Sequence, residues 1–116
     1  MHEMSIAQDL LTQIELAISD RRVRRLHAVR LDIGAQRLIV PEALQLAFEA
    51  LARGTVAEGA RLELVEIPTE AECRACSLHF APAIDDYVCP RCGEADVRFV
   101  AGNDIILRSL EAETDD

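Results

Sequence analysis

The stretches CRAC, residues 73–76, and CPRCG, residues 89–93, decide the fold of the second half of the chain. Two Cys-x-x-Cys pairs separated by twelve residues are typical of a ribbon, in which each pair holds one side of a tetrahedral metal. Pro90 can fix the turn, and Gly93 can adopt the left-handed conformation that lets backbone N–H groups face sulfur. All-thiolate coordination selects zinc, and four protein ligands leave no position for water. We therefore expect a structural zinc site formed by Cys73, Cys76, Cys89 and Cys92.

Other interpretations of this cluster are weaker. A thioredoxin-like redox site needs one active Cys-x-x-Cys pair at a helix N-terminus, and two pairs at ribbon spacing argue against it. His79, just past the first pair, is an alternative ligand, although a histidine at such a position is more commonly a surface residue. Ser77 occupies the place that Gly93 has in the second pair, and it suits a tight turn less well.

The segment that holds every cysteine, residues 69–96, has only scattered apolar residues. At about 28 residues it is shorter than a chain that usually folds without help. Metal binding would supply the missing stability, on the order of 10 kcal/mol or more. We predict that residues 1–68 and 97–116 form the main domain and that residues 69–96 are a zinc-ribbon insertion.

The main domain shows helical and strand periodicity. Residues 5–19 predict a first helix, with Ser5 and Gln8 as a capping box. A second helix begins at Pro41 and ends before Gly54. Three strands are expected over residues 27–33, 60–67 and 104–111. The expected fold class is therefore α+β: a small three-stranded sheet with two helices, plus the inserted four-cysteine zinc ribbon.

Composition limits the classes of protein. The 116 residues are 50% hydrophobic but include only three Phe, one Tyr and no Trp, so the core is modest. The net charge of −9 disfavours nucleic acid and anionic membranes as partners. The longest uncharged stretch, residues 75–84, is too short to span a bilayer. The N-terminus, with His2, Glu3 and Asp9, does not resemble a signal peptide. We expect a cytoplasmic protein.

The segment from Arg21 to Arg25 contains the only concentration of basic residues. It is either a solvated turn or, less commonly, a docking patch for an acidic partner. His27 alternates with strand residues and is expected to be a packed or edge histidine rather than a ligand. Exposed strand edges leave a homodimer open, although nothing in the pattern requires one.

The first three residues, Met1-His2-Glu3, form a second candidate metal site. An N-terminal amine has an ordinary pKa of about 7.7 to 8.0, so it can lose its proton and bind metal at neutral pH. The amine, the next amide nitrogen and the His2 ring can form fused chelate rings, completed by a further amide or by the Glu3 carboxylate. Planar nitrogen-rich coordination favours Ni(II) or Cu(II) over zinc. Taken alone, however, a histidine at position two is more commonly a solvated side chain.

Several motifs together resemble the HypA family of nickel chaperones for [NiFe]-hydrogenase maturation. The resemblance is carried by MHEMSIA (1–7), VxLxIG (29–34), PEAL (41–44), Phe48-Glu49, Gly54-Thr55, EGAxL (58–62), both Cys pairs with CPxCG (89–93), and SLE (109–111). It covers almost the whole chain in order.

The resemblance implies nickel bound through Met1, His2 and Glu3, and zinc on the four cysteines. It implies that Ni(II) is a transferable cargo and zinc a structural cofactor. The implied partners are the GTPase HypB and the hydrogenase large-subunit precursor, with urease maturation proteins as further partners in some members.

The main alternative is a zinc-ribbon adaptor that binds another protein and has no functional nickel site. An enzyme is disfavoured, because the sequence shows no catalytic triad, no Gly-rich phosphate loop and no open metal site.

Overall fold

The computed structural model describes residues 2–83 and 86–115, and the chain divides into two compact units. The first unit contains Met1–Leu31, Ile39–Leu64 and Leu107–Asp116, and the second contains Asp32–Leu38 and Val65–Ile106. The two units differ in what fills their interiors.

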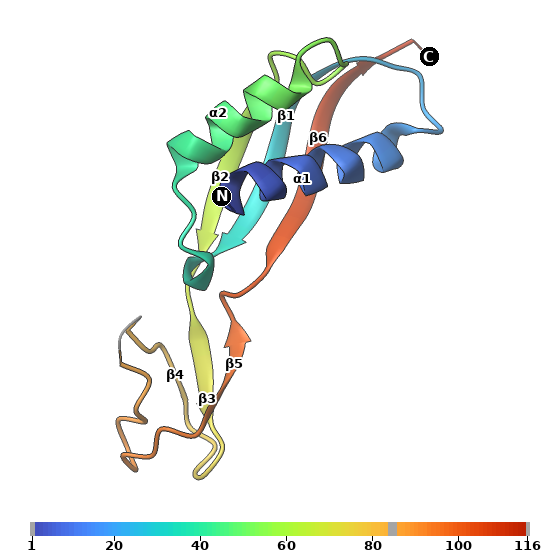
Figure 1. Cartoon of the computed structure of the whole chain (residues 1–116). Helices are drawn as coiled ribbons and strands as arrows, with labels where there is room; N and C mark the ends of the chain where they lie inside the picture. Colours follow the sequence, from blue (N-terminus) through green and yellow to red (C-terminus); the bar gives the residue numbers. More distant parts are fainter. Residues whose placement is uncertain (1, 84–85, 116) are drawn as a thin grey trace. The chain divides into compact units, whose positions relative to one another are not determined.

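The first unit contains most of a three-stranded sheet, of which residues 32–34, 65–67 and 105–106 fall in the second unit. Strands β1 (Val23–Gly34), β2 (Arg61–Ile67) and β6 (Ile105–Thr114) lie in the order β2-β1-β6. Strands β1 and β2 run in the same direction and β6 runs in the opposite one (Figure 1). Parallel neighbours cannot be joined by a tight turn and need a crossover connection. Helix α2 (Pro41–Ala52) lies in that connection.

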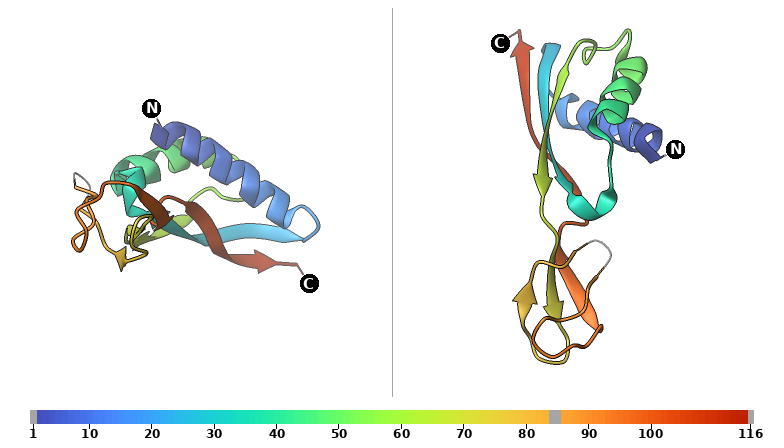
Figure 2. Two further views of the ribbon diagram at one scale, coloured as in Figure 1. Left: turned by 90° about the horizontal axis from the view of Figure 1, so that it is seen from below. Right: turned by 90° about the vertical axis from the view of Figure 1, so that its left-hand side faces the viewer.

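Two helices cover one face of this sheet. Helices α1 (His2–Ile18) and α2 lie on the same side of the strands (Figure 2). Burying one large aliphatic or aromatic side chain contributes about 1.5–3 kcal/mol, so the apolar layer between helices and sheet stabilises the unit. Its largest fully buried side chains are Ile14, Leu26, Val29, Leu31, Leu44 and Phe48.

Helix α1 begins earlier than the sequence predicts. It starts at His2, so the predicted capping box of Ser5 and Gln8 is wrong. Ser5 lies inside the helix, and its hydroxyl donates to the carbonyl oxygen of His2 at 3.3 Å. Residues 2–4 contain no helix breaker, and Glu3 places a negative charge in the first turn, where the helix dipole favours it.

The other elements of this unit are close to their predicted bounds. Helix α2 has Pro41 in its first turn and ends at Ala52, and Gly54 then adopts a φ of 79°. Strand β2 matches the predicted strand closely, and β6 covers nearly all of the predicted strand but continues three residues further, to Thr114. Strand β1 starts earlier than predicted, at Val23. The prediction missed its first residues because the exposed Arg24 and Arg25 interrupt the apolar alternation by which a strand is recognised.

The second unit contains a smaller antiparallel sheet. Strands β3 (Glu70–Cys73), β4 (His79–Phe80) and β5 (Val97–Ala101) lie in the order β4-β3-β5. Cys73 pairs with Val97. Few side chains are buried around this sheet, and they are small: Ala71, Cys73 and Cys89 are each at most 1% exposed. Among the described residues, this sheet has almost no apolar core.

The second unit extends beyond the predicted insertion of residues 69–96. Strand β5 belongs to it because β5 pairs with β3. Residues 32–38 belong to it because the Gly34 N–H donates to the Asp104 carbonyl at 2.8 Å. A Cβ atom on Gly34 would lie 2.2 Å from the backbone of Gly102, so two backbone segments touch where only glycine fits. The sequence contains no local signal of this long-range contact.

The predicted fold class is confirmed. Helices and a three-stranded sheet form one part, and a ribbon that carries all four cysteines forms the other, in an α+β arrangement.

Candidate metal centre

The first knuckle, residues 73–78, is a tight turn that follows β3. The Ser77 N–H donates to the Cys73 carbonyl at 2.8 Å, and the Cys73 N–H donates to the Leu78 carbonyl at 2.9 Å. Ser77 has a φ of 65°, a left-handed value that residues other than glycine, asparagine and aspartate seldom adopt. Ser77 is less suited than glycine to a positive φ, but it adopts the left-handed conformation that the turn requires.

The second knuckle, residues 89–94, repeats this pattern. The Gly93 N–H donates to the Cys89 carbonyl at 2.9 Å, and the Cys89 N–H donates to the Glu94 carbonyl at 2.9 Å. Gly93 has a φ of 77°, as the sequence predicts for a left-handed knuckle residue. Both cysteine pairs are therefore presented by the same backbone geometry.

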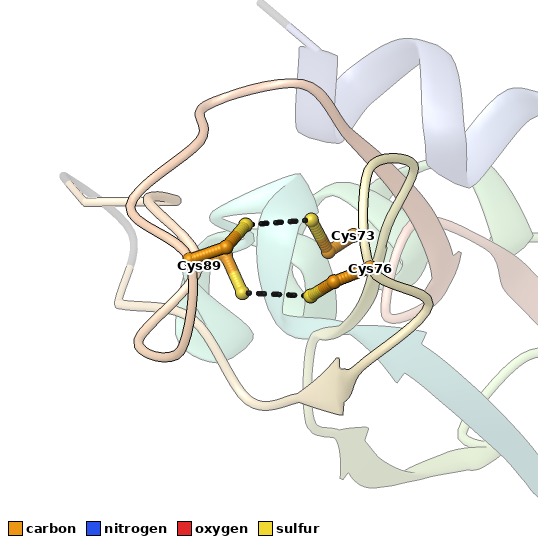
Figure 3. A group of neighbouring side chains, drawn as sticks. Cys73, Cys76 and Cys89 are labelled. Atoms are coloured by element: carbon orange, nitrogen blue, oxygen red, sulfur yellow. Dashed lines mark hydrogen bonds between the residues drawn. The ribbon is translucent and has the colours of Figure 1, made fainter.

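The four cysteine side chains converge between the two knuckles. Their Sγ atoms all lie within 4.8 Å of one another, and all four are free thiols. The Sγ atoms are 3.5 Å apart in Cys73 and Cys92 and 3.6 Å apart in Cys76 and Cys89. Cys73, Cys76 and Cys89 point toward one another in Figure 3. A tetrahedron of sulfurs about 2.3 Å from zinc has edges of about 3.8 Å, so the donor set fits a thiolate-bound metal.

The environments of the thiols differ. Hydrogen bonds from the Leu78 N–H and from Arg91 lower the pKa of Cys76 to about 6. The Glu94 N–H lowers the pKa of Cys92, but hydrogen bonding to Cys73 and burial outweigh it and raise that pKa to about 12. Burial opposes ionisation of Cys89, but the Cys92 and Arg91 N–H groups outweigh it and lower the pKa of Cys89 as well, so negative charge is favoured on Cys76 and Cys89 over Cys92. A metal must displace protons from the other thiols, and its affinity falls as pH falls.

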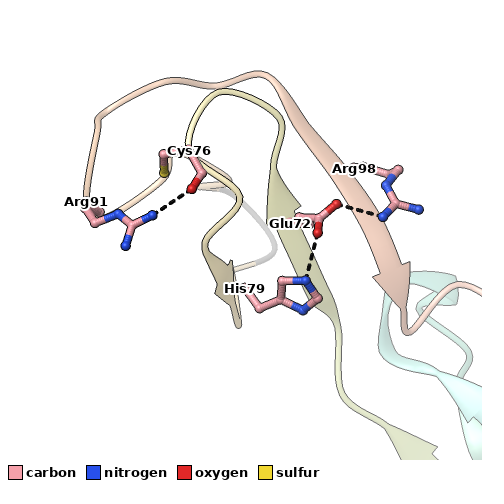
Figure 4. Close-up of polar contacts among 5 residues, drawn as sticks. All are labelled: Glu72, Cys76, His79, Arg91 and Arg98. Carbon is pink, nitrogen blue, oxygen red and sulfur yellow. Dashed lines mark hydrogen bonds and ion pairs between the residues drawn. The ribbon is translucent and has the colours of Figure 1, made fainter.

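Two polar networks lie around the ribbon (Figure 4). Glu72 accepts a hydrogen bond from Arg98 at 2.7 Å and pairs with the His79 ring at 2.8 Å, and these partners lower the pKa of Glu72. His79 therefore faces a carboxylate and does not belong to the sulfur group. Separately, Arg91 donates to the Cys76 carbonyl at 2.7 Å.

The sequence analysis assigned no role to Glu72 or to Arg91. The available signal for Arg91 was its position between Cys89 and Cys92, where a cation is close to developing thiolate charge. No local pattern indicated Glu72, because its partners come from other strands.

The second predicted site lies at the start of α1. The His2 Nε2 is 3.4 Å from a carboxylate oxygen of Glu3, and the Val40 N–H donates to the same oxygen at 3.4 Å. The side chain of His2 is 56% exposed and that of Glu3 is 15% exposed. Hydrogen bonds from its own N–H and from the Val40 N–H lower the pKa of Glu3. Met1, the third predicted nickel ligand, lies outside the described residues.

The other residues singled out by sequence lie in the first unit. His27 lies in β1 and is partly exposed. Its ring pairs with Glu113 at 2.8 Å. Arg24 pairs with Asp115 at 3.4 Å, while Arg21 and Arg22 line a polar surface pocket together with Asp20 and Thr114.

Comparison with a protein-family model identifies the class of protein to which this chain belongs. The fold and the four-thiol centre define a metal-binding protein, and the family model that matches residues 1–112 is described as "Hydrogenase/urease nickel incorporation, metallochaperone, hypA". The chain belongs to the HypA family. This family comprises metallochaperones that act as hydrogenase maturation factors, not enzymes.

Individual relatives agree with this assignment. The hydrogenase maturation factor HypA of Geobacter sulfurreducens is 42% identical over 97% of this chain and all of that protein. The corresponding protein of Azotobacter chroococcum is 39% identical with the same coverage. The solution structure of the Ni metallochaperone HypA from Helicobacter pylori has a TM-score of 0.71 at 27% identity, and covers 97% of this chain and 98% of that one. A second HypA solution structure has a TM-score of 0.73 at 30% identity, covering 97% of each chain.

Within residues 2–83 and 86–115, neither helix has the length and apolar character needed to cross a bilayer.

Proposed function

We propose that this chain binds Ni(II) at its N-terminal end and delivers it for [NiFe]-hydrogenase maturation, with structural zinc in the cysteine cluster. One observation carries the proposal: the chain belongs over residues 1–112 to a family of nickel metallochaperones. The two candidate metal sites add chemical support, because one has nitrogen and oxygen donors and the other has four sulfurs. These donor sets favour different metals.

The proposed nickel ligands are the Met1 amine, His2 and Glu3. The first N–H groups of an α-helix have no acceptor within the helix, and His2 and Glu3 are the first two residues of α1. No helical hydrogen bond therefore has to break for these amides to coordinate a metal, although the Glu3 N–H would give up its bond to its own carboxylate. The Val40 N–H holds the Glu3 carboxylate beside the His2 ring, which reduces the motion that a ligand must lose on binding.

A histidine beside a carboxylate is not enough to define the nickel site. Each histidine of the chain has a glutamate partner: His2 with Glu3, His27 with Glu113, and His79 with Glu72. What distinguishes His2 is its place at the beginning of α1, one residue from the proposed amine ligand. An open site of this kind exchanges ligands readily, as delivery requires.

The proposed zinc ligands are Cys73, Cys76, Cys89 and Cys92. When bound, zinc would cross-link the two knuckles and stabilise the fold of the ribbon. Four sulfur ligands leave no position for a reacting water, so zinc there would be structural.

The proposed partners are HypB, which is a GTPase, and the hydrogenase large-subunit precursor, with urease maturation proteins as further candidates. The proposed location is the cytoplasm. The family description supports a role in nickel incorporation into hydrogenase or urease.

A calorimetric nickel titration of tag-free, zinc-loaded protein tests the proposal. We expect one tight nickel site that is lost in His2→Ala and in a variant with glycine placed before Met1. His27→Ala is the matched control, since it removes another partly exposed histidine from a glutamate pair, and it should bind nickel normally. Binding that survives both changes would place nickel elsewhere, and no binding by the wild type would favour the zinc-ribbon adaptor.

The pH dependence gives a second readout. Protons compete with nickel for the amine and imidazole lone pairs, so nickel affinity should weaken as pH falls below about 6. Titrations at several pH values measure this change. A constant affinity over the range would exclude the His2 and amine ligands.

A further inference from the structure

Arg91 connects the two knuckles of the cysteine ribbon. It lies between Cys89 and Cys92 in the second knuckle, and its Nη2 donates to the Cys76 carbonyl of the first knuckle at 2.7 Å (Figure 4). A hydrogen bond of this length from a guanidinium is in the strong, charge-assisted range. The contact joins residues that are 15 positions apart in the sequence.

The same guanidinium lies close to the cysteine cluster. Arg91 follows Cys89 by two residues and directly precedes Cys92, and its Nη2 bonds the carbonyl of Cys76 itself. The charge of Arg91 therefore lies beside the cluster as well as beside the carbonyl that it bonds.

The two knuckles share a backbone pattern but not this contact. The residue of the first knuckle that corresponds to Arg91 is Ala75, which has no polar side chain. The arginine of the first knuckle, Arg74, pairs instead with Asp96 at 3.3 Å. The hydrogen bond across the cluster therefore runs in one direction, from the second knuckle to the first.

A cation at this place has a clear electrostatic effect. Four thiolates around a divalent metal have a net charge of −2, on a chain whose own net charge is already −9. A guanidinium next to the sulfurs offsets part of that charge. Its planar donors also fix the Cys76 carbonyl, which a lysine ammonium would hold with less definite geometry.

We propose that Arg91 is a positioning residue of the metal centre, which clamps the first knuckle to the second and slows release of the metal from the four cysteines. This inference rests on the proposed occupation of the cluster by zinc. It is independent of nickel at the N-terminal end.

Zinc transfer to an excess of the chromophoric chelator 4-(2-pyridylazo)resorcinol tests the clamp in the zinc-loaded, full-length chain. Loss of a group that supports metal ligands typically costs about 10- to 100-fold in metal affinity. Because the clamp acts on dissociation, we expect Arg91→Ala to release zinc about 10- to 100-fold faster than the wild type. Arg91→Lys keeps the charge without the planar donors and should give an intermediate rate. Arg74→Ala is the matched control, because it removes an equal charge from the same ribbon but leaves the Cys76 contact intact, and it should release zinc at the wild-type rate.

Cobalt substitution adds a readout that a general loss of stability would not produce. Hydrogen bonding and nearby charge change the energy of thiolate-to-cobalt charge transfer, so the absorption band should shift in Arg91→Ala and not in Arg74→Ala. If Arg91→Ala is purified with less than one zinc while Arg74→Ala retains a full zinc, the clamp is supported.

Two failures of the experiment can be told apart. Wild-type release from zinc-loaded Arg91→Ala, with an unshifted cobalt band, would refute the clamp and leave the zinc assignment standing. Wild-type protein that binds no zinc at all would refute the zinc assignment and the clamp with it.

Discussion

The two units of this chain differ in the side chains that they bury. The first unit buries large side chains such as Phe48, Ile14 and Leu26 between two helices and a sheet. The small sheet of the second unit buries mainly Ala71 and two cysteines, and its close contacts are made by backbone and sulfur. Apolar burial stabilises the first, whereas the second depends on groups that a metal can bind.

This difference between the units indicates how their contributions to stability can be tested separately. We expect a unit with a side-chain core to keep its fold when no metal is present, so the proposed N-terminal nickel site could load and release an ion without unfolding the unit. A ribbon without such a core is folded when its metal is bound. We therefore expect metal removal and core mutation to affect different parts of the chain.

The largest effect should come from removing the ribbon metal. Chelation of the proposed zinc, or Cys89→Ser at a buried proposed ligand, should unfold the cysteine ribbon, since structural zinc contributes on the order of 10 kcal/mol or more. Two-dimensional amide NMR spectra should show signals of residues 70–101 collapsing to random-coil positions while those of α1 and α2 persist. Simultaneous loss of both sets would mean that the units do not fold independently.

A smaller effect, confined to the other unit, should follow from Phe48→Ala. Phe48 is 0% exposed in α2, and truncation of such a side chain typically costs about 3–5 kcal/mol. Thermal unfolding followed by helical circular dichroism should show a lowered Tm, with the zinc content unchanged. Leu46→Ala is the control, because Leu46 lies in the same helix but is 66% exposed. Zinc loss in Phe48→Ala would contradict the separation.

The smallest effect should come from Glu3→Gln. Its own N–H and the Val40 N–H lower the pKa of Glu3 in the folded chain below the ordinary value of 4.5. The carboxylate therefore stabilises the fold above that value, and the contribution is lost as pH falls through the lowered pKa. In nickel-free protein, Glu3→Gln should lower Tm slightly at pH 7, and the difference from wild type should vanish in strong acid. A difference independent of pH would exclude this mechanism.

Features with a local pattern were predicted well from the sequence. The start of α2 at Pro41 and its end before Gly54 follow from groups within one helical turn. The convergence of the four sulfurs follows from the spacing of the two Cys-x-x-Cys pairs, because each knuckle is closed by hydrogen bonds between near neighbours. The start of α1 was missed because Ser5 satisfies the pattern of a cap in sequence, although the helix continues through it.

The sequence by itself determined the two helices, the three main strands, the donor chemistry of the cysteine cluster and the resemblance to the HypA family. Each depends on residue type and short-range spacing. Only the tertiary structure decided that Gly34 touches Gly102, that β5 joins the ribbon, and that Arg91 bonds the first knuckle. Those contacts join segments far apart in the chain, and their formation depends on how the whole backbone folds rather than on any local pattern.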